Sequence, residues 1–136
     1  MTITEFLTAR LDEDEAVARA AAPRAQREWA VSPGAPLVEG SRWNVVSAER
    51  DQYAPDLPAA RIAEMYLEFP YGGERRAAEH IARHDPARLL AEVEAKRRII
   101  DRVEQHARYG GVVLYLLAPL ALPYADHPDY DESWRP

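Results

Sequence analysis

Residues 80–100 read HIARHDPARLLAEVEAKRRII, and this stretch shows where the longest helix begins and which face it buries. Asp85 is a suitable N-cap, because its carboxylate can accept hydrogen bonds from the free amides of a first helical turn. Pro86 then takes the first helical position, where its missing amide hydrogen costs little. The predicted buried stripe consists of Leu89, Leu90, Val93, Ile100, Val103 and Ala107. The following pair, Gly110 and Gly111, predicts the end of this helix.

A second helix is predicted near the start of the chain, over residues 2–22. Thr2 and Glu5 have the spacing of a capping box, in which each side chain accepts a hydrogen bond from the backbone amide of the other residue. Pro23 ends the segment. The predicted buried face consists of Ile3, Phe6, Leu7, Leu11, Val17, Ala18 and Ala21. We interpret the acidic run at residues 12–15 as a solvated helix face.

Two further helices are predicted. Residues 74–83 have helical periodicity, with small or aliphatic residues on one side. These residues are Ala77, Ala78 and Ile81. Residues 112–122 contain no polar face, so we expect a helix that is buried on most sides and bent or broken near Pro119, with a strand as the alternative. A membrane span needs roughly 20 apolar residues, and this run is too short to provide one.

The segment between the helices predicted at 2–22 and 74–83 favours a small antiparallel sheet. β-branched and aromatic residues indicate strands at 28–31, 42–47 and 61–69, with Pro and Gly residues marking the turns around them. The third candidate alternates imperfectly, so a helix over 61–69 stays open as the alternative.

These elements predict an α+β fold in a single domain over residues 1–136. The chain is long enough for one core and short for two. We expect an N-terminal helix, a small three-stranded antiparallel sheet, two or three helices packed on one face of that sheet, and an extended aromatic tail. The corresponding segments are 2–22, 27–69, 74–122 and 123–136.

The composition excludes several kinds of site. The chain has no cysteine, which excludes disulfides, thiolate zinc sites and cysteine nucleophiles. Its net charge of −6 argues against general affinity for nucleic acids. The sequence contains neither a glycine-rich phosphate loop nor a recognisable nucleophile–base pair, so we expect no cofactor and lean against an enzyme. The start of the chain lacks the pattern of a signal peptide, and we expect a cytoplasmic protein.

The last seventeen residues, 120–136, read LALPYADHPDYDESWRP and are unusually rich in large side chains. Aromatic rings with two prolines favour an extended segment that docks on the domain, although four acidic residues would make an exposed tail expand. The alternative is an arm that docks on a partner chain. The candidate contact residues for a partner are Tyr124, Asp126, His127, Tyr130 and Trp134 in the tail, together with Arg97 and Arg98 on the long helix.

Two alternatives involve charged or metal-ligating residues. A small metal-dependent hydrolase would use His80, His84, Asp85, Asp126 and His127. The two histidines at 80 and 84 are one helical turn apart, but Pro86 and the capping role of Asp85 argue against this site. A weak nucleic-acid binder would use the helix face around Arg97 and Arg98. Acidic residues on the same helix are expected to neutralise that face.

Four short blocks of this sequence, together with Trp134, carry a family resemblance. The blocks are 6–15, 80–88, 94–99 and 120–130. They resemble a family of small, functionally uncharacterised actinobacterial proteins that also occur in actinophages. The resemblance implies the same fold and no particular activity. It also implies that some relatives carry a cysteine-containing insertion suggestive of zinc between the long helix and the tail; this chain has 109–117 there, without cysteine.

The function that these observations favour is a non-enzymatic binding protein in the cytoplasm, of actinobacterial or phage origin. Its expected partner is another protein or a second copy of the same chain. We expect no membrane partner, and the charge pattern argues against nucleic acid.

Overall fold

The computed structural model describes residues 1–21, 27–33, 43–49, 52–54, 56, 58, 61–65, 73–106 and 110–136. Within these residues it contains four α-helices and three strands, which confirms the predicted α+β fold with an N-terminal helix. The contacts divide the chain into two compact units, which are described separately. One unit comprises Met1–Val17 and Leu90–Pro136, and the other Ala18–Leu89. The single domain over 1–136 stays a prediction.

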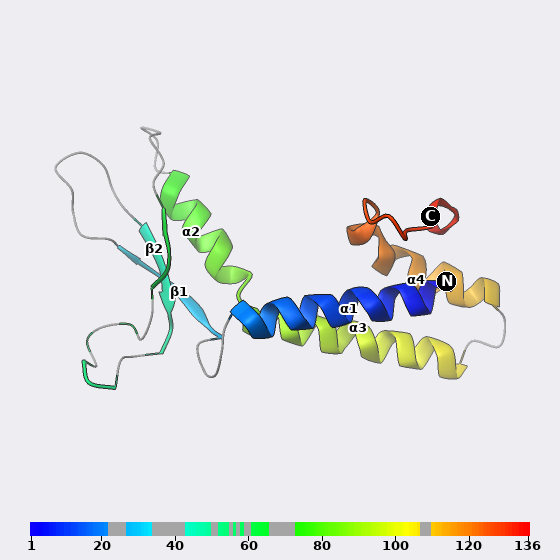
Figure 1. The fold of residues 1–136 in the computed structure, drawn as a ribbon, viewed down its shortest axis with the longest axis horizontal. Helices are drawn as coiled ribbons and strands as arrows, with labels where there is room; N and C mark the ends of the chain where they lie inside the picture. The colour runs from blue at the N-terminus through cyan, green and yellow to red at the C-terminus, as the bar shows by residue number, and fades with distance from the viewer. Residues whose placement is uncertain are drawn as a thin grey trace. The chain divides into compact units, whose positions relative to one another are not determined.

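The unit Ala18–Leu89 contains a three-stranded antiparallel sheet (Figure 1). Its strands are β1 (Trp29–Pro33), β2 (Trp43–Ser47) and β3 (Arg61–Met65), paired in the order β1-β2-β3. The predicted meander is therefore confirmed, and residues 61–65 form a strand rather than a helix. Residues 66–69, which the prediction included in that strand, lie outside the described part of the chain.

Helix α2 (Gly73–Arg83) packs on this sheet. The core between them is small, because its buried members are Val45, Ala78 and Ala82. The partly buried side chains around it are Trp29, Val31, Ile62, Ala63 and Ile81. The face predicted for this helix is confirmed by Ala78 and Ile81. The first turn of α3 also belongs to this unit, whereas the rest of α3 and all of α4 belong to the other.

The start of α3 (Pro86–His106) follows the prediction from residues 84–86 closely. Asp85 caps the helix, since its Oδ1 accepts a 2.8 Å hydrogen bond from the amide of Arg88. Its Oδ2 accepts a second bond, of 3.2 Å, from the amide of Trp29 in β1. The amide of Ala87 donates to the carbonyl of Arg27 at 3.1 Å. One carboxylate thus fixes both the helix start and the beginning of the sheet.

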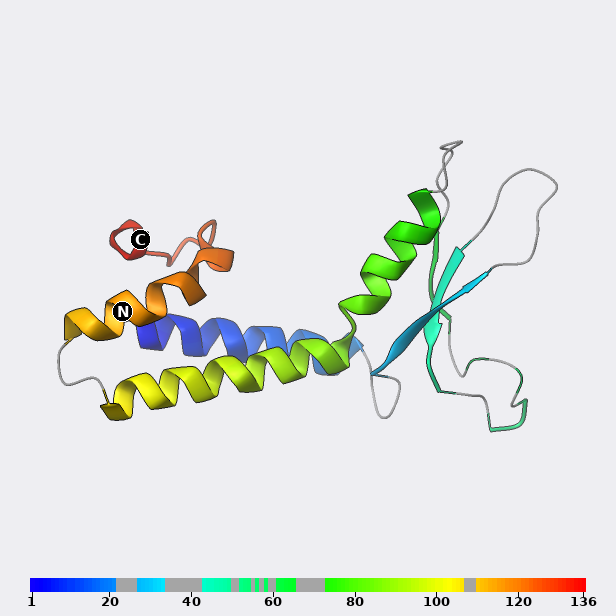
Figure 2. The same cartoon turned by 180° about the vertical axis from the view of Figure 1, so that it is seen from behind.

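In the other unit, α1 (Ile3–Ala21) and α3 lie side by side and run in opposite directions (Figure 2). The predicted capping box is present: the Thr2 amide donates to Glu5 Oε2 at 2.7 Å, and the Glu5 amide donates to Thr2 Oγ1 at 3.2 Å. The hydrogen bonds from Thr2 lower the pKa of Glu5. The core of this unit consists of Ile3, Phe6, Leu7, Leu11, Val93, Ile100, Leu117, Ala118, Ala121 and Trp134.

Two parts of the predicted helical faces are wrong. Val17 and Ala21 were assigned to the buried face of the first helix, but both are exposed. Their spacing fits the apolar stripe, but no apolar surface among the described residues covers them. On α3, Val93 and Ile100 are buried, whereas Leu89, Leu90 and Val103 are half-buried. Ala107 lies outside the described residues.

Helix α4 (Gly110–Ala121) continues through Pro119 to Ala121, so residues 112–121 form neither a strand nor a helix broken at the proline. The expectation that this segment is buried on most sides is wrong. Leu117, Ala118 and Ala121 face the core, but the opposite side of the helix is exposed. No helix among the described residues is long and apolar enough to cross a bilayer.

Candidate functional site

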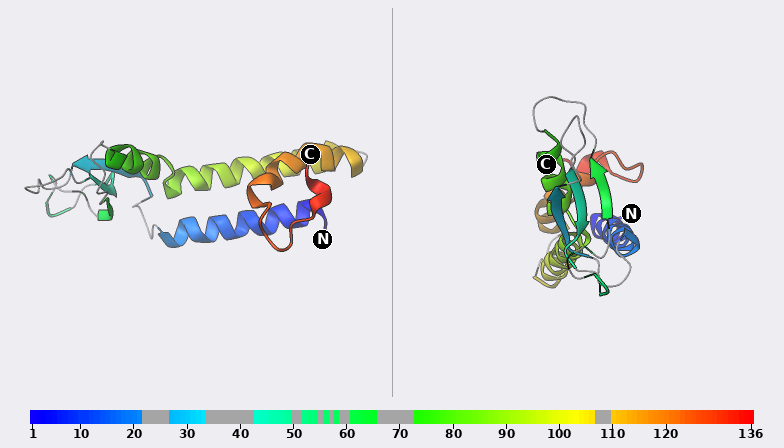
Figure 3. Two further views of the ribbon diagram at one scale, coloured as in Figure 1. Left: turned by 90° about the horizontal axis from the view of Figure 1, so that it is seen from above. Right: turned by 90° about the vertical axis from the view of Figure 1, so that its left-hand side faces the viewer.

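The C-terminal tail folds back onto α1 of its own chain (Figure 3). It contains two short 3-10 helices, η1 (Leu122–Tyr124) and η2 (Glu132–Trp134). Asp131 starts η2 by accepting a 2.8 Å hydrogen bond from the amide of Ser133, and hydrogen bonds from Ser133 lower the pKa of Asp131. The tail therefore contains ordered structure of its own.

Phe6 is the centre of the contact between tail and helix. Its side chain is fully buried, and four tail rings surround it. The ring centroids lie 6.3 Å from Tyr124, 5.8 Å from His127, 6.0 Å from Tyr130 and 5.0 Å from Trp134. Most of these contacts are edge-to-face, which is a favoured geometry for aromatic pairs. Burial of Phe6 and Trp134, with partial burial of the other three rings, holds the tail on α1.

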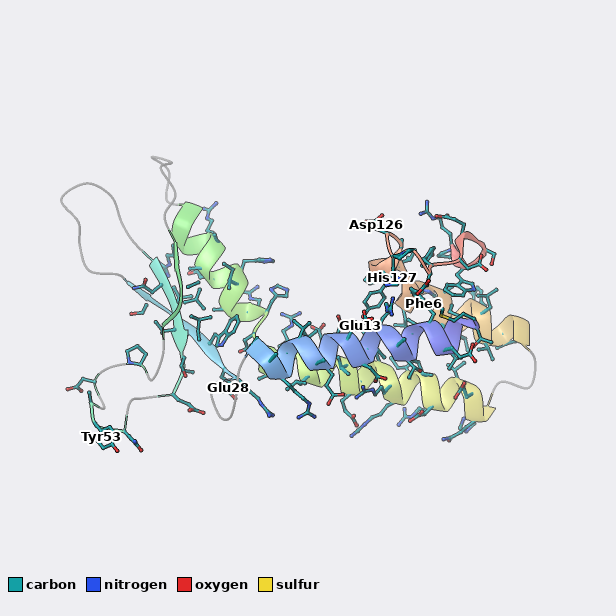
Figure 4. All side chains as sticks on the ribbon, in the orientation of Figure 1. Phe6, Glu13, Glu28, Tyr53, Asp126 and His127 are labelled. Atoms are coloured by element: carbon teal, nitrogen blue, oxygen red, sulfur yellow. The ribbon has the colours of Figure 1, made fainter. Side chains whose placement is uncertain are left out.

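Two polar contacts fix the register of the tail on α1. The hydroxyl of Tyr124 donates to Asp14 Oδ2 at 2.5 Å, and burial, followed by this hydrogen bond, raises the pKa of Tyr124. Arg10 is itself buried, contacts Nε2 of His127 through Nη1, and donates through Nη2 to Glu13 Oε1 at 2.8 Å. Figure 4 shows His127 beside Phe6, whereas Asp126 is exposed.

Arg97 and Arg98 both make ion pairs within the chain. Arg97 donates to Glu15 Oε2 at 2.6 Å and to Asp12 Oδ1 at 2.5 Å, so its partners lie on α1 rather than on its own helix. These bonds, the one to Glu15 first, raise the pKa of Arg97. Arg98 pairs with Glu94, one turn earlier, at 2.8 Å. Both guanidinium groups are therefore engaged with carboxylates.

The acidic run at residues 12–15 does more than face solvent. Each of its four carboxylates has a hydrogen-bonding role: two hold Arg97, one holds Arg10 and one accepts from Tyr124. The acidic run was interpreted as a solvated helix face. This fits Asp12 and Glu13, whose side chains remain largely exposed. Sequence reasoning missed Arg97 and Tyr124 as partners because they lie more than 80 positions away along the chain. Arg10, in contrast, is only three residues from Glu13. The local clue was an acidic run beside the apolar stripe.

The residues of the hydrolase alternative fall in both units. The rings of His80 and His84 are in contact, with centroids 4.4 Å apart and planes tilted by 44°, and His84 donates from Nδ1 to the carbonyl of His80 at 2.8 Å. Asp85 is the helix cap. The other two members, Asp126 and His127, belong to the tail. Among the described residues, no group of three or more metal-ligating side chains is close enough to hold an ion.

The largest feature that sequence reasoning missed is the outer face of α4. Val112, Tyr115 and Leu116 have 44%, 80% and 47% of their surface exposed. Their spacing of three and four residues places them on one side of the helix. The sequence of Gly110–Ala121 contains no charged residue. This lack of charge predicts a buried helix, so it identifies an unusual segment but not its exposed side.

Two grooves flank this face. One, of about 580 Å³, lies between α4 and the end of the tail. Its walls are Leu114, Tyr115, Leu116, Ala118, Pro119, Ser133, Trp134, Arg135 and Pro136. The other, of about 610 Å³, lies between α4 and the end of α3, and is lined by Arg102, Val103, Gln105, His106, Val112 and Leu116. Leu116 lines both grooves. The name α4 surface is used below for Val112, Tyr115 and Leu116 with these two grooves.

Comparison with known proteins identifies one family. Residues 1–136 match the family described as "Family of unknown function (DUF6221)". No curated protein and no solved structure matches the chain.

Proposed function

We propose that this chain, which belongs to the DUF6221 family, is a non-enzymatic protein-interaction module that binds its partner through the α4 surface. The observation that carries the proposal is an uncharged helix with one apolar side exposed, in a protein with a net charge of −6. The proposed location is the cytoplasm of an actinobacterium or of a bacterium infected by its phage. These origins rest on the resemblance of the sequence blocks.

The exposed residues of α4 form a patch rather than isolated positions. Single exposed apolar side chains are normal in folded proteins, but contiguous ones mark interaction surfaces. Here a tyrosine is flanked by two aliphatic residues within five positions of one helix. Tyrosine is enriched at protein interfaces because it adds a large apolar contact and one hydroxyl group. The patch therefore has the chemistry of an interface core.

The tail contributes to this surface chiefly through Trp134. Its indole is buried against Phe6 and also forms part of the groove beside α4. Tyr124, His127 and Tyr130 contact Phe6, so a partner-binding role would require them to leave α1. We therefore propose that the tail supports the binding surface, and that its rings do not form the surface themselves.

The two alternatives receive less support. The metal-dependent hydrolase would need more ligands around His80 and His84 than the described residues provide. Nucleic-acid binding through Arg97 and Arg98 would compete with the three carboxylates that these residues already contact. No observation favours either reaction or ligand over a protein partner.

The proposal can be tested by affinity capture with three forms of the protein. Tyr115→Glu places a charge in the α4 surface, and Tyr53→Glu is the matched control, since Tyr53 is 88% exposed in the other unit. We expect one protein to be retained by the wild type and by the control but lost with Tyr115→Glu. The captured protein, once purified, should bind saturably in a calorimetric titration. Equal capture by all three forms would refute the assignment to α4.

A further inference from the structure

We propose that His80 and His84 bind one divalent transition-metal ion, of the Cu²⁺, Ni²⁺ or Zn²⁺ class, as a two-imidazole chelate at the end of α2. The proposal concerns the unit Ala18–Leu89 and does not depend on the function proposed for the α4 surface. It follows from the separation of the two rings, from the hydrogen bond that orients His84, and from the state of the neighbouring carboxylates. The site binds an ion without hydrolytic chemistry, because catalytic zinc centres have three protein ligands and this site has two.

The two imidazoles are in contact, one helical turn apart. His80 lies in the last turn of α2, and the turn continues past the helix end, where the amide of His84 donates to the carbonyl of Ile81 at 3.1 Å. The ring centroids are 4.4 Å apart. Two imidazoles that hold one ion through nitrogens at about 2.0 Å have ring centres about 4.5–5 Å apart, for N–metal–N angles of about 90–110°. The rings are therefore close to the separation that a shared ion requires.

A backbone hydrogen bond determines which nitrogen of His84 is available to an ion. Nδ1 donates to the carbonyl of His80 at 2.8 Å, and since a carbonyl can only accept, Nδ1 carries the proton. In the neutral ring the lone pair is then on Nε2. Metal-ligating histidines commonly donate their other N–H to a backbone carbonyl, which fixes the tautomer and the orientation of the ring. Both histidines are exposed, so an ion can reach them from solvent.

The neighbouring carboxylates are already engaged, and this sets the class of ion. Both oxygens of Asp85 accept hydrogen bonds from backbone amides, those of Trp29 and Arg88. Glu79 pairs with Arg75 at 2.8 Å. A donor set of imidazoles suits Cu²⁺, Ni²⁺ and Zn²⁺, whereas Mg²⁺ and Ca²⁺ require oxygen ligands. We expect Cu²⁺ to bind more tightly than Ni²⁺ or Zn²⁺, with water in the remaining coordination positions.

His106 provides a comparison within the same chain. Its Nδ1 donates to the carbonyl of Arg102 at 2.9 Å, which is the bond that His84 makes to the residue one turn earlier. The residue one turn before His106 is an arginine, so this oriented imidazole has no second imidazole beside it. Two ligands held in place bind an ion more tightly than one, because the second binds at a high effective concentration. His106→Ala is therefore the matched control for loss of a single exposed histidine.

Calorimetric titration of the untagged full chain with Ni²⁺ tests the site. At about pH 8, where free imidazole is neutral, we expect one ion per chain for the wild type and for His106→Ala, and no binding of Mg²⁺. His80→Ala and His84→Ala should each weaken the binding of Ni²⁺ by at least about tenfold, since each leaves a single ligand. An affinity of the wild type no greater than that of either single variant would overturn the proposal.

A register variant separates a chelate from a simple excess of histidine. His80→Ala combined with Glu79→His keeps two histidines but spaces them five residues apart, which places them about 140° apart around a helix. This variant should bind Ni²⁺ as weakly as His80→Ala. Saturating Ni²⁺ should also raise the melting temperature of the wild type more than that of the register variant, because the chelate forms only in the folded chain. Wild-type affinity in the register variant, or equal shifts of the two melting temperatures, would contradict a chelate at His80 and His84.

Discussion

The hydroxyl of Tyr124 donates a 2.5 Å hydrogen bond to Asp14, a residue 110 positions earlier in the chain. This bond joins the tail to the middle of α1, beside the ring cluster around Phe6. Since Trp134 of the same tail forms one wall of the groove on α4, the bond also helps to keep the proposed binding surface in place.

Removal of the Tyr124 hydroxyl should destabilise this unit without loss of the ring contact. A hydrogen bond to a charged group contributes about 1.5–3 kcal/mol, and we expect Tyr124→Phe to lower the free energy of unfolding by about 1.5 kcal/mol. Urea denaturation followed by circular dichroism measures this change. Unchanged stability of the variant would show that the bond is replaced by water at no cost.

The pH dependence of this contribution has a definite sign. Burial and the bond to Asp14 raise the folded-state pKa of Tyr124 above its ordinary value of 10.0. The unfolded chain therefore loses the proton first, so the stability due to this group is complete below pH 10 and falls as the pH rises toward the folded-state pKa. We expect the stability difference between wild type and Tyr124→Phe to shrink above pH 10. A difference that stays constant from pH 8 to 11.5 would contradict this.

Loss of the Phe6 ring should release the tail. Phe6 is fully buried, and truncation of such a ring costs about 3–5 kcal/mol. In Phe6→Ala we expect fast amide hydrogen exchange across residues 122–136, where the backbone hydrogen bonds of η1 and η2 now protect several amides. Tyr53→Ala is the control and should leave exchange in the tail unchanged.

If Phe6→Ala fails to fold, Phe6→Leu provides a milder test. It retains apolar volume and removes only the aromatic contacts. Faster exchange in the tail than in α3 would support the account, whereas equal acceleration throughout the chain would show that Phe6 has no special relation to the tail.

Arg97 and Arg98 are adjacent in sequence but should differ in their effect on stability. Arg97 binds two carboxylates of α1, whereas Arg98 makes one exposed pair on its own helix. Exposed pairs contribute between 0 and about 1 kcal/mol, so we expect about 1 kcal/mol of destabilisation for Arg97→Gln and less than about 0.5 for Arg98→Gln. The difference between the variants in chemical denaturation should diminish in 1 M salt. Identical stabilities at low salt would argue against the link between α1 and α3.

Local sequence signals predicted the starts of elements well. The Thr2–Glu5 capping box and the Asp85 cap depend on residues within three positions of one another, so their geometry follows from spacing alone. The three strands were likewise visible from composition and turn residues. Strand pairing could be predicted because strands that are consecutive in sequence tend to pair.

Contacts between distant segments could not be predicted in the same way. The sequence indicates that Arg97 needs carboxylates, but four acidic residues on its own helix were nearer in sequence than Asp12 and Glu15. Helix α4 shows the same limitation for burial. An uncharged apolar helix is expected in a core, and only the arrangement of its neighbours shows that one side is left uncovered.

Photo-crosslinking in producing cells tests the central claim most directly. A benzoylphenylalanine at position 115, compared with one at position 53, reports which surface lies against another protein. The account predicts a discrete covalent adduct from position 115, identifiable by mass spectrometry, and no such adduct from position 53. The absence of any adduct at position 115 from a stably folded variant would contradict the assignment of α4 as the interaction surface.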